Sequence, residues 1–495
     1  MNNLKFLKLY LFRLINRYIN KLFPLQKNSD KIISPLNQVS LKRSFIPTSD
    51  LFKKIAYFFV VIIIVFLVFQ IWKSNKVSIV CPVISEGVVG VYNRTNLPPV
   101  VTSLLSEPLI TLDKSGKPIE KLVESVKALD DNSRYILSLR KDLYWNDGIK
   151  VKSSDIQINL PDTEVSYPDD LTINFKLADT FTPFLTLLTQ PVLKPGSLVG
   201  LGKYKVNYQD TNRNLISKLV LQPIEPNKCL DNPYINIRFY PDEQTAKTAF
   251  ELGEIDVILI IQDTGNLAQQ PNVIIKKIQN YSKLAAIFYN TKDTVLDKNF
   301  RKALSFSTNL TPNEDIAKTS IPPVSWAFNN DLKVIRGDAE SAKTALAKVA
   351  KFKENQIILT TTPFFNQLAE KIVADWKNVG INAVVRVESG VPQNFQALLT
   401  SVTIPHDPDQ YALWHSTQNN TNLSKYSSPR VDKDLEDGRK TDNIEKRKEE
   451  YWDFQKVLQD DVPATFLYFP KINVVYRKKI EESLNKIISL QLPGS

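Results

Sequence analysis

The side chains that could carry metal or acid–base chemistry are few. The sequence has two histidines, His406 and His415, and Asp407 and Asp409 lie beside the first of them. Such a group could hold a divalent cation weakly, although isolated histidines are more often structural. The motifs HExxH, CxxC, GxSxG and GxxxxGK[ST] do not occur in the sequence. Our prediction is therefore no catalytic residue, no metal site, no cofactor and no enzyme activity. A weak divalent-cation site beside His406 is the alternative that the sequence leaves open.

Two cysteines, Cys81 and Cys229, leave the redox chemistry open. A disulfide between them would fit a compartment that oxidises thiols, whereas two buried free thiols would fit a reducing one. The sequence does not decide between these two states.

The net charge of +11 comes mainly from the N-terminal tail. Residues 1–54 hold 11 Lys and Arg and two Asp, which leaves 52 basic and 50 acidic residues in the rest of the chain. A nearly neutral body offers no charge-driven surface for a polyphosphate. We therefore expect no nucleic-acid partner and assign the basic tail to a membrane.

Residues 55–72 form an unbroken apolar segment in which Gln70 is the single polar side chain. A helix of 18 residues covers about 27 Å, close to the thickness of a bilayer core. Lys53, Lys54 and Lys73 flank the segment where ammonium groups reach the headgroups. We predict one transmembrane helix that is not cleaved, because no small-residue cleavage pattern follows it. The basic tail should stay in the cytoplasm and the C-terminal body should lie outside.

The tail before this segment has two parts. Residues 4–23 place Lys and Arg on one side of a helical wheel and Leu and Ile on the other. This pattern is typical of a helix on an anionic inner leaflet, although a partner-binding helix has the same pattern. Residues 24–54 include three prolines and are expected to be an unstructured linker.

Residues 77–495 alternate short β-rich runs with amphipathic helical runs, which predicts α/β lobes. The expected strands are 135–140, 171–177, 218–223, 235–240, 255–261, 283–289, 356–360 and 383–387. The expected helices are 243–252, 299–307, 339–350, 364–379 and 444–460. Asp242 is a predicted N-cap, and Gly253 and Gly380 are predicted helix stops.

The run 135–156, YILSLRKDLYWNDGIKVKSSDI, resembles a signature of the family-5 extracellular solute-binding proteins. These proteins are the oligopeptide and dipeptide receptors of ABC importers. The positions that carry this resemblance are Trp145, Asn146, Asp147, Gly148, Ser154 and Asp155. The same residues predict a hairpin turn with positive φ at Gly148 and with Trp145 as its anchor in the core.

Further segments resemble the family in the same order along the chain. They are 200–204 (GLGKY), 240–256 (YPDEQTAKTAFELGEID), 288–304 (FYNTKDTVLDKNFRKAL), 376–382 (WKNVGIN) and 407–470. One such segment alone would be weak evidence of a family resemblance. An ordered set of them spans most of residues 77–495, so nearly all of the outer body resembles this family.

The resemblance implies a two-lobed, clamshell α/β fold of type II after the single N-terminal transmembrane helix. Lobe one would combine residues 77–108, 195–282 and 468–495, a small extra domain would span 109–194, and lobe two would span 283–467. The small domain is expected to be shortened, because Ile156 leads almost at once to Pro161 and a strand. Solute would be enclosed when the lobes close about a hinge.

The resemblance also implies the site and the partners. We expect the cleft to be lined by Asn93 and Asn96 of lobe one and by Thr403, His406, Asp407, Trp414, His415 and Asn419 of lobe two. Peptide receptors of the family often have a Trp and an Asp where this chain has Ser401 and Ile404, so no salt bridge to a free α-amine is expected there.

The leading hypothesis is a monomeric, membrane-tethered receptor that passes a peptide or small-molecule ligand to an ABC permease. One alternative is a surface sensor or scaffold that keeps the fold without transport. A second alternative is a metal-dependent surface enzyme.

Overall fold

The computed structural model describes residues 57–66, 81–309, 316–349, 356–390, 392 and 394–492. Residues 1–79 and 80–495 form two separate units. In the first unit, residues 57–66 are helical and their side chains are exposed. Within the described ranges, no helix has both the length and the apolar character needed to cross a bilayer. The rest of the predicted span, the basic helix at 4–23 and the linker at 24–54 lie outside the described residues.

Lobe one is built on a seven-stranded sheet with the order β12-β18-β11-β1-β10-β9-β8. Strand β1 runs parallel to β10 and β11, and the other neighbours are antiparallel. The strands are β1 (Val83–Val89), β8 (Tyr204–Asn212), β9 (Leu215–Pro223), β10 (Tyr234–Tyr240), β11 (Val257–Ile261), β12 (Val273–Gln279) and β18 (Lys471–Arg477). Its helices are α3 (Pro99–Leu105), α4 (Glu243–Glu251), α11 (Glu481–Asn485) and α12 (Ile488–Gln491).

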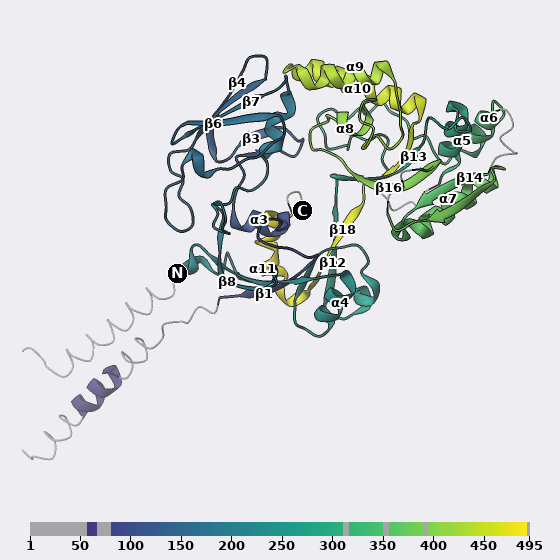
Figure 1. Cartoon of the computed structure of the whole chain (residues 1–495). Helices are drawn as coiled ribbons and strands as arrows, with labels where there is room; N and C mark the ends of the chain where they lie inside the picture. Colours follow the sequence, from purple (N-terminus) through teal and green to yellow (C-terminus); the bar gives the residue numbers. More distant parts are fainter. Residues whose placement is uncertain are drawn as a thin grey trace, which may run out of the picture. The chain divides into compact units, whose positions relative to one another are not determined.

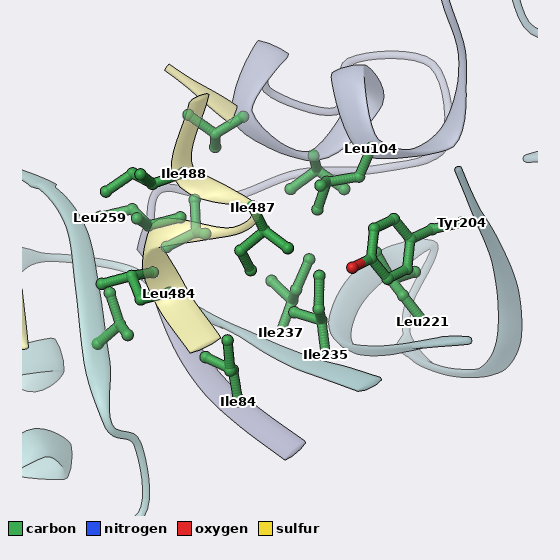
Figure 2. Close-up of a cluster of buried hydrophobic side chains, with 14 of the residues drawn as sticks. Ile84, Leu104, Tyr204, Leu221, Ile235, Ile237, Leu259, Leu484, Ile487 and Ile488 are labelled. Atoms are coloured by element: carbon green, nitrogen blue, oxygen red, sulfur yellow. The ribbon is translucent and has the colours of Figure 1, made fainter. Parts of the chain in front are cut away.

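The core of lobe one joins segments that are far apart in the sequence. Figure 2 shows Ile487 and Ile488, near the C-terminus, in the same cluster as Ile84 of β1 and Ile237 of β10. Burying an isoleucine side chain contributes about 1.5–3 kcal/mol. The C-terminal helices therefore complete this lobe.

The small domain holds a four-stranded antiparallel sheet, β4-β5-β7-β6, and a separate hairpin, β2-β3. Its strands are β2 (Ile110–Leu112), β3 (Pro118–Glu120), β4 (Val123–Leu129), β5 (Arg134–Leu139), β6 (Thr163–Asp169) and β7 (Thr172–Leu177). Two 3₁₀ helices, η1 (Ser153–Asp155) and η2 (Thr182–Leu188), complete it.

The turn that carries the family signature has the predicted form. Gly148 has a φ of +87°, and the Gly148 amide donates to the Trp145 carbonyl at 2.7 Å. The Trp145 side chain is buried among the apolar residues of the small domain. This part of the sequence-based interpretation is confirmed.

Lobe two is built on the five-stranded sheet β15-β14-β16-β13-β17. Its strands are β13 (Lys283–Tyr289), β14 (Ile357–Thr361), β15 (Ala383–Val387), β16 (Ala397–Thr403) and β17 (Ala464–Tyr468). Its helices are α5 (Lys298–Ser307), α6 (Ala339–Leu346), α7 (Asn366–Asn378), α8 (Tyr411–Trp414), α9 (Pro429–Lys440) and α10 (Ile444–Asp461). Strand β13 is buried at every position after Lys283, as expected for a central strand covered on both faces.

The predicted helix ends are also present. The Asp242 carboxylate accepts a hydrogen bond from the Thr245 amide at 2.8 Å, which caps α4. Gly253 and Gly380, which follow α4 and α7, have positive φ angles of 79° and 94°. These residues end the helices because a left-handed conformation costs glycine little.

A disulfide joins Cys81 to Cys229, with their Cα atoms 5.4 Å apart. It links the segment before β1 to the loop before β10, two strands that pair in parallel. A bond of this kind persists in oxidising compartments outside the cytoplasm. The structure thus decides a question that the sequence left open.

Candidate solute-binding site

Two chain crossings connect lobe one to lobe two. Residues 280–282 join β12 to β13, and residues 469–470 join β17 to β18. The crossings are paired, because the Asn280 amide donates to the Pro470 carbonyl at 3.0 Å and the ring centroids of Tyr281 and Phe469 lie 5.5 Å apart. Two adjacent crossings of a few residues each are typical of a hinge between domains.

The candidate binding loops follow the carboxyl ends of parallel strands, where α/β sheets usually bind ligands. In lobe one, the loop 90–96 follows β1, which is parallel to β10 and β11. In lobe two, the loop 404–410 follows β16, which is parallel to β14. The Ile404 amide donates to the Ser282 carbonyl at 2.9 Å, so the second loop begins beside the hinge.

Asn93 and Asn96 hold each other in the loop of lobe one. The Asn93 amide donates to Asn96 Oδ1 at 2.6 Å, and Asn93 Oδ1 accepts from the Thr95 amide at 2.8 Å. Asn96 is exposed and Asn93 is partly exposed. Their side-chain oxygens therefore shape this loop.

The loop of lobe two is anchored by two ion pairs. Asp407 is buried and accepts from Arg447 Nη2 at 2.7 Å, and Asp409 accepts from Arg439 Nη2 at 2.8 Å. Burial raises the pKa of Asp407, and the guanidinium of Arg447 opposes that rise. Because both carboxylates have cationic partners within the lobe, the loop is held by helices α9 and α10.

Trp414 and His415 lie inside lobe two. Trp414 is 1% exposed, donates from Nε1 to Gln410 Oε1 at 3.0 Å, and packs on Phe288. His415 lies between Thr417, 2.8 Å from Nδ1, and a glutamate on α9. Both side chains stabilise α8 and its connection to α9.

Thr403, His406 and Asn419 are exposed. Thr403 ends β16, His406 lies in the loop 404–410, and Asn419 lies in the segment after α8. Among the described residues, no hydrogen bond or ion pair joins the predicted residues of lobe one to those of lobe two. The binding role of all eight residues stays a prediction.

The small domain reaches lobe two beside this loop. The turn between β2 and β3 receives a hydrogen bond from the Trp326 amide to the Ser115 carbonyl, at 3.2 Å. Gly116 lies so close that a Cβ atom there would be 3.0 Å from the His406 carbonyl oxygen. The loop 404–410 is therefore next to both the hinge and the small domain.

Sequence reasoning did not single out Arg439, Arg447 or Trp326. Arg447 lies 5.2 Å from the ring centroid of Trp326 while it pairs with Asp407, a residue forty positions earlier in the chain. The amphipathic pattern of 444–460 could have indicated that Arg447 is buried, because it falls on the same face as Tyr451, but the pattern does not identify its carboxylate partner. In the ranges that the structure covers, no group of three or more His, Cys, Asp or Glu side chains could hold a metal ion.

Comparison with known proteins shows which family this chain resembles. The profile of the "bacterial extracellular solute-binding proteins, family 5 Middle" matches residues 117–423, more than half of the chain. The dipeptide-binding protein of Escherichia coli is 22% identical over 448 residues, covering 73% of this chain and 83% of that protein. The probable D,D-dipeptide-binding periplasmic protein DdpA of the same organism is 20% identical, covering 74% and 83%.

Solved structures show the same two-lobed α/β fold. The murein tripeptide-binding protein MppA in its unliganded open form has a TM-score of 0.65 at 18% identity, covering 80% of this chain and 93% of that one. DppA of Helicobacter pylori, in complex with the peptide STSA, has a TM-score of 0.59 at 18% identity, covering 80% and 94%. With the family profile spanning most of the small domain and much of both lobes, this chain belongs to the bacterial extracellular solute-binding proteins of family 5.

Proposed function

We propose that this protein captures a peptide or a similar extended solute between its lobes and delivers it to an ABC permease. The observation that carries the proposal is the pair of crossings at 280–282 and 469–470, beside which the loop 404–410 begins. A hinge next to a binding loop lets one solute contact both lobes only in the closed state, so binding and closure favour each other. A permease can then distinguish the loaded receptor from the empty one.

The solute class follows from the relatives and from the loop chemistry. Relatives named for dipeptides and tripeptides support a peptide. In this chain Asp407 and Asp409 are each paired with an arginine of lobe two. Because these carboxylates already have cationic partners, we expect the protein to recognise a peptide through main-chain and uncharged groups rather than through its α-ammonium group. Blocking the amino terminus of a peptide should therefore weaken binding little.

We further propose that residues 55–72 anchor the receptor in the membrane, with the basic tail inside and the lobes outside. The described part of this segment, residues 57–66, is a helix whose side chains are 44–70% exposed. An apolar helix exposed on all sides is unfavourable in water and favourable in lipid. Protease added to intact cells should then digest the part beyond residue 80 and leave the tail protected.

Thermal unfolding in the presence of peptides tests the binding proposal. A library of dipeptides to hexapeptides, each free and N-acetylated, should contain members that raise the unfolding temperature. A ligand present at about 100 times its Kd stabilises a protein by about 2.7 kcal/mol. No shift with any peptide, combined with normal folding, would instead favour a sensor or scaffold role without solute capture. We also propose that the peptide is bound unchanged, so its mass should be the same before and after incubation.

A further inference from the structure

One arginine of lobe two contacts both the loop 404–410 and the small domain. Arg439, near the end of α9, donates from Nη2 to Asp409 at 2.8 Å. Its guanidinium lies 4.0 Å from the ring centroid of Tyr411 and 5.0 Å from that of Phe181, which belongs to the small domain. Next to it, the hydroxyl of Thr182 donates to the Lys440 carbonyl at 3.1 Å. This group forms the first contact between α9 and the small domain, and Figure 1 shows the ribbon of α9 next to that domain.

The second contact involves His406 of the same loop. It consists of the hydrogen bond from the Trp326 amide to the Ser115 carbonyl and the close approach of Gly116 to the His406 carbonyl. Arg447 lies over the Trp326 ring at 5.2 Å and pairs with Asp407 at 2.7 Å. Each carboxylate of the loop is thus held by an arginine, and each arginine lies beside one contact with the small domain.

The contact region between the small domain and lobe two is interrupted rather than continuous. A cavity of about 710 Å³ separates residues 128–132 of the small domain from α9 and α10. Its lining is strongly charged, with Asp130 and Asp131 on the small domain and with Asp437, Asp442, Lys440 and Lys446 on lobe two. Because this cavity keeps the two surfaces apart, docking of the small domain depends on the few direct contacts.

We propose that Arg439 and Arg447 are positioning residues that couple the loop 404–410 to the docking of the small domain on lobe two. A solute that moves the loop would shift both carboxylates, and therefore both arginines and the two contacts beside them. The small domain would then dock on lobe two when the two lobes close over the solute. The role of this coupling in solute capture rests on the proposed function, whereas the coupling itself needs no solute.

Hydrogen–deuterium exchange on the full-length protein in detergent tests the coupling, with residue resolution and no added solute. The reporter is the Trp326 amide, whose acceptor, Ser115, lies on the small domain. Arg439→Ala and, separately, Phe181→Leu should speed its exchange roughly 2- to 30-fold, the range that loss of a cation–π contact gives. Neither residue is bonded to Trp326, so a purely local role would leave this amide unchanged.

The control is Arg430→Ala on the same helix, because Arg430 is largely exposed and pairs with Asp453 of α10. It should leave Trp326 exchange at the parent rate. Arg439→Lys retains the charge and should give a smaller increase, and it replaces Arg439→Ala if that variant does not fold. Unchanged Trp326 exchange in both Arg439→Lys and Phe181→Leu, or equal acceleration in the control, would refute the coupling. If these variants speed the exchange of the Trp326 amide but no peptide stabilises the protein, the coupling stands and the proposed function fails.

Discussion

A buried glutamate in the core of lobe one allows a quantitative test of the structure. Glu86, on β1, is 0% exposed and accepts a hydrogen bond from Gln491 Nε2 at 2.7 Å. Its other oxygen, Oε1, has no hydrogen-bond partner among the residues that the structure describes. Burial raises its pKa from 4.5 to about 7, and the bond from Gln491 opposes the rise. Helix α12 therefore covers a carboxyl group that loses its proton less readily in the folded protein than in the unfolded chain.

The sign of the effect on stability follows from linkage. The folded protein binds this proton more tightly than the unfolded chain, so the free energy of unfolding falls as pH rises between 4.5 and about 7. A pKa difference of this size corresponds to about 3 kcal/mol, fully expressed above pH 7. Glu86→Gln imitates the protonated side chain and removes the titration. The variant should match the parent near pH 4.5 and be more stable by up to about 3 kcal/mol at pH 8.

The assay is urea unfolding of both proteins, followed by circular dichroism at several pH values from 4.5 to 8. The difference between the two proteins cancels the titration of the other groups. Glu120→Gln, on the exposed strand β3, serves as the control for loss of a carboxylate. A stability difference between Glu86→Gln and the parent that does not change with pH would refute the burial of Glu86 beneath α12.

Two further predictions concern Arg447 and the disulfide. Arg447→Met should destabilise the protein by about 3–5 kcal/mol, because it leaves the Asp407 carboxylate buried without its cation. Adding Asp407→Asn to this variant should recover part of the lost stability. Chemical unfolding of the single and the double variant measures both effects. Reduction, or Cys81→Ser, should lower stability by up to about 5 kcal/mol, since the bond to Cys229 closes a loop of 148 residues; an unchanged unfolding temperature after reduction would contradict a formed disulfide.

The parts of the fold that could be predicted are those set by local sequence. Asp242 and Gly253 delimit α4 because capping and positive φ are properties of single residues. Trp145 and Gly148 gave the hairpin turn for the same reason. The family and its two-lobed α/β fold, predicted from ordered motifs of this kind, are confirmed.

The site was harder to predict because its partners are distant in the chain. His406, Asp407 and Asp409 were grouped as a possible weak site for a divalent cation, yet Asp407 is paired with Arg447 and Asp409 with Arg439. No local pattern reveals which of many lysines and arginines meets a given carboxylate. The same limit applies to the short helices α11 and α12, whose burial depends on strands of lobe one four hundred positions away.

Native mass spectrometry of the protein purified without added ligand tests the central claim most directly. If two lobes close over a captured solute, part of the population should carry an additional small mass that denaturation releases, and fragmentation should identify it as a peptide. A preparation that folds normally, carries no additional mass and still binds none after incubation with a peptide mixture would contradict the account.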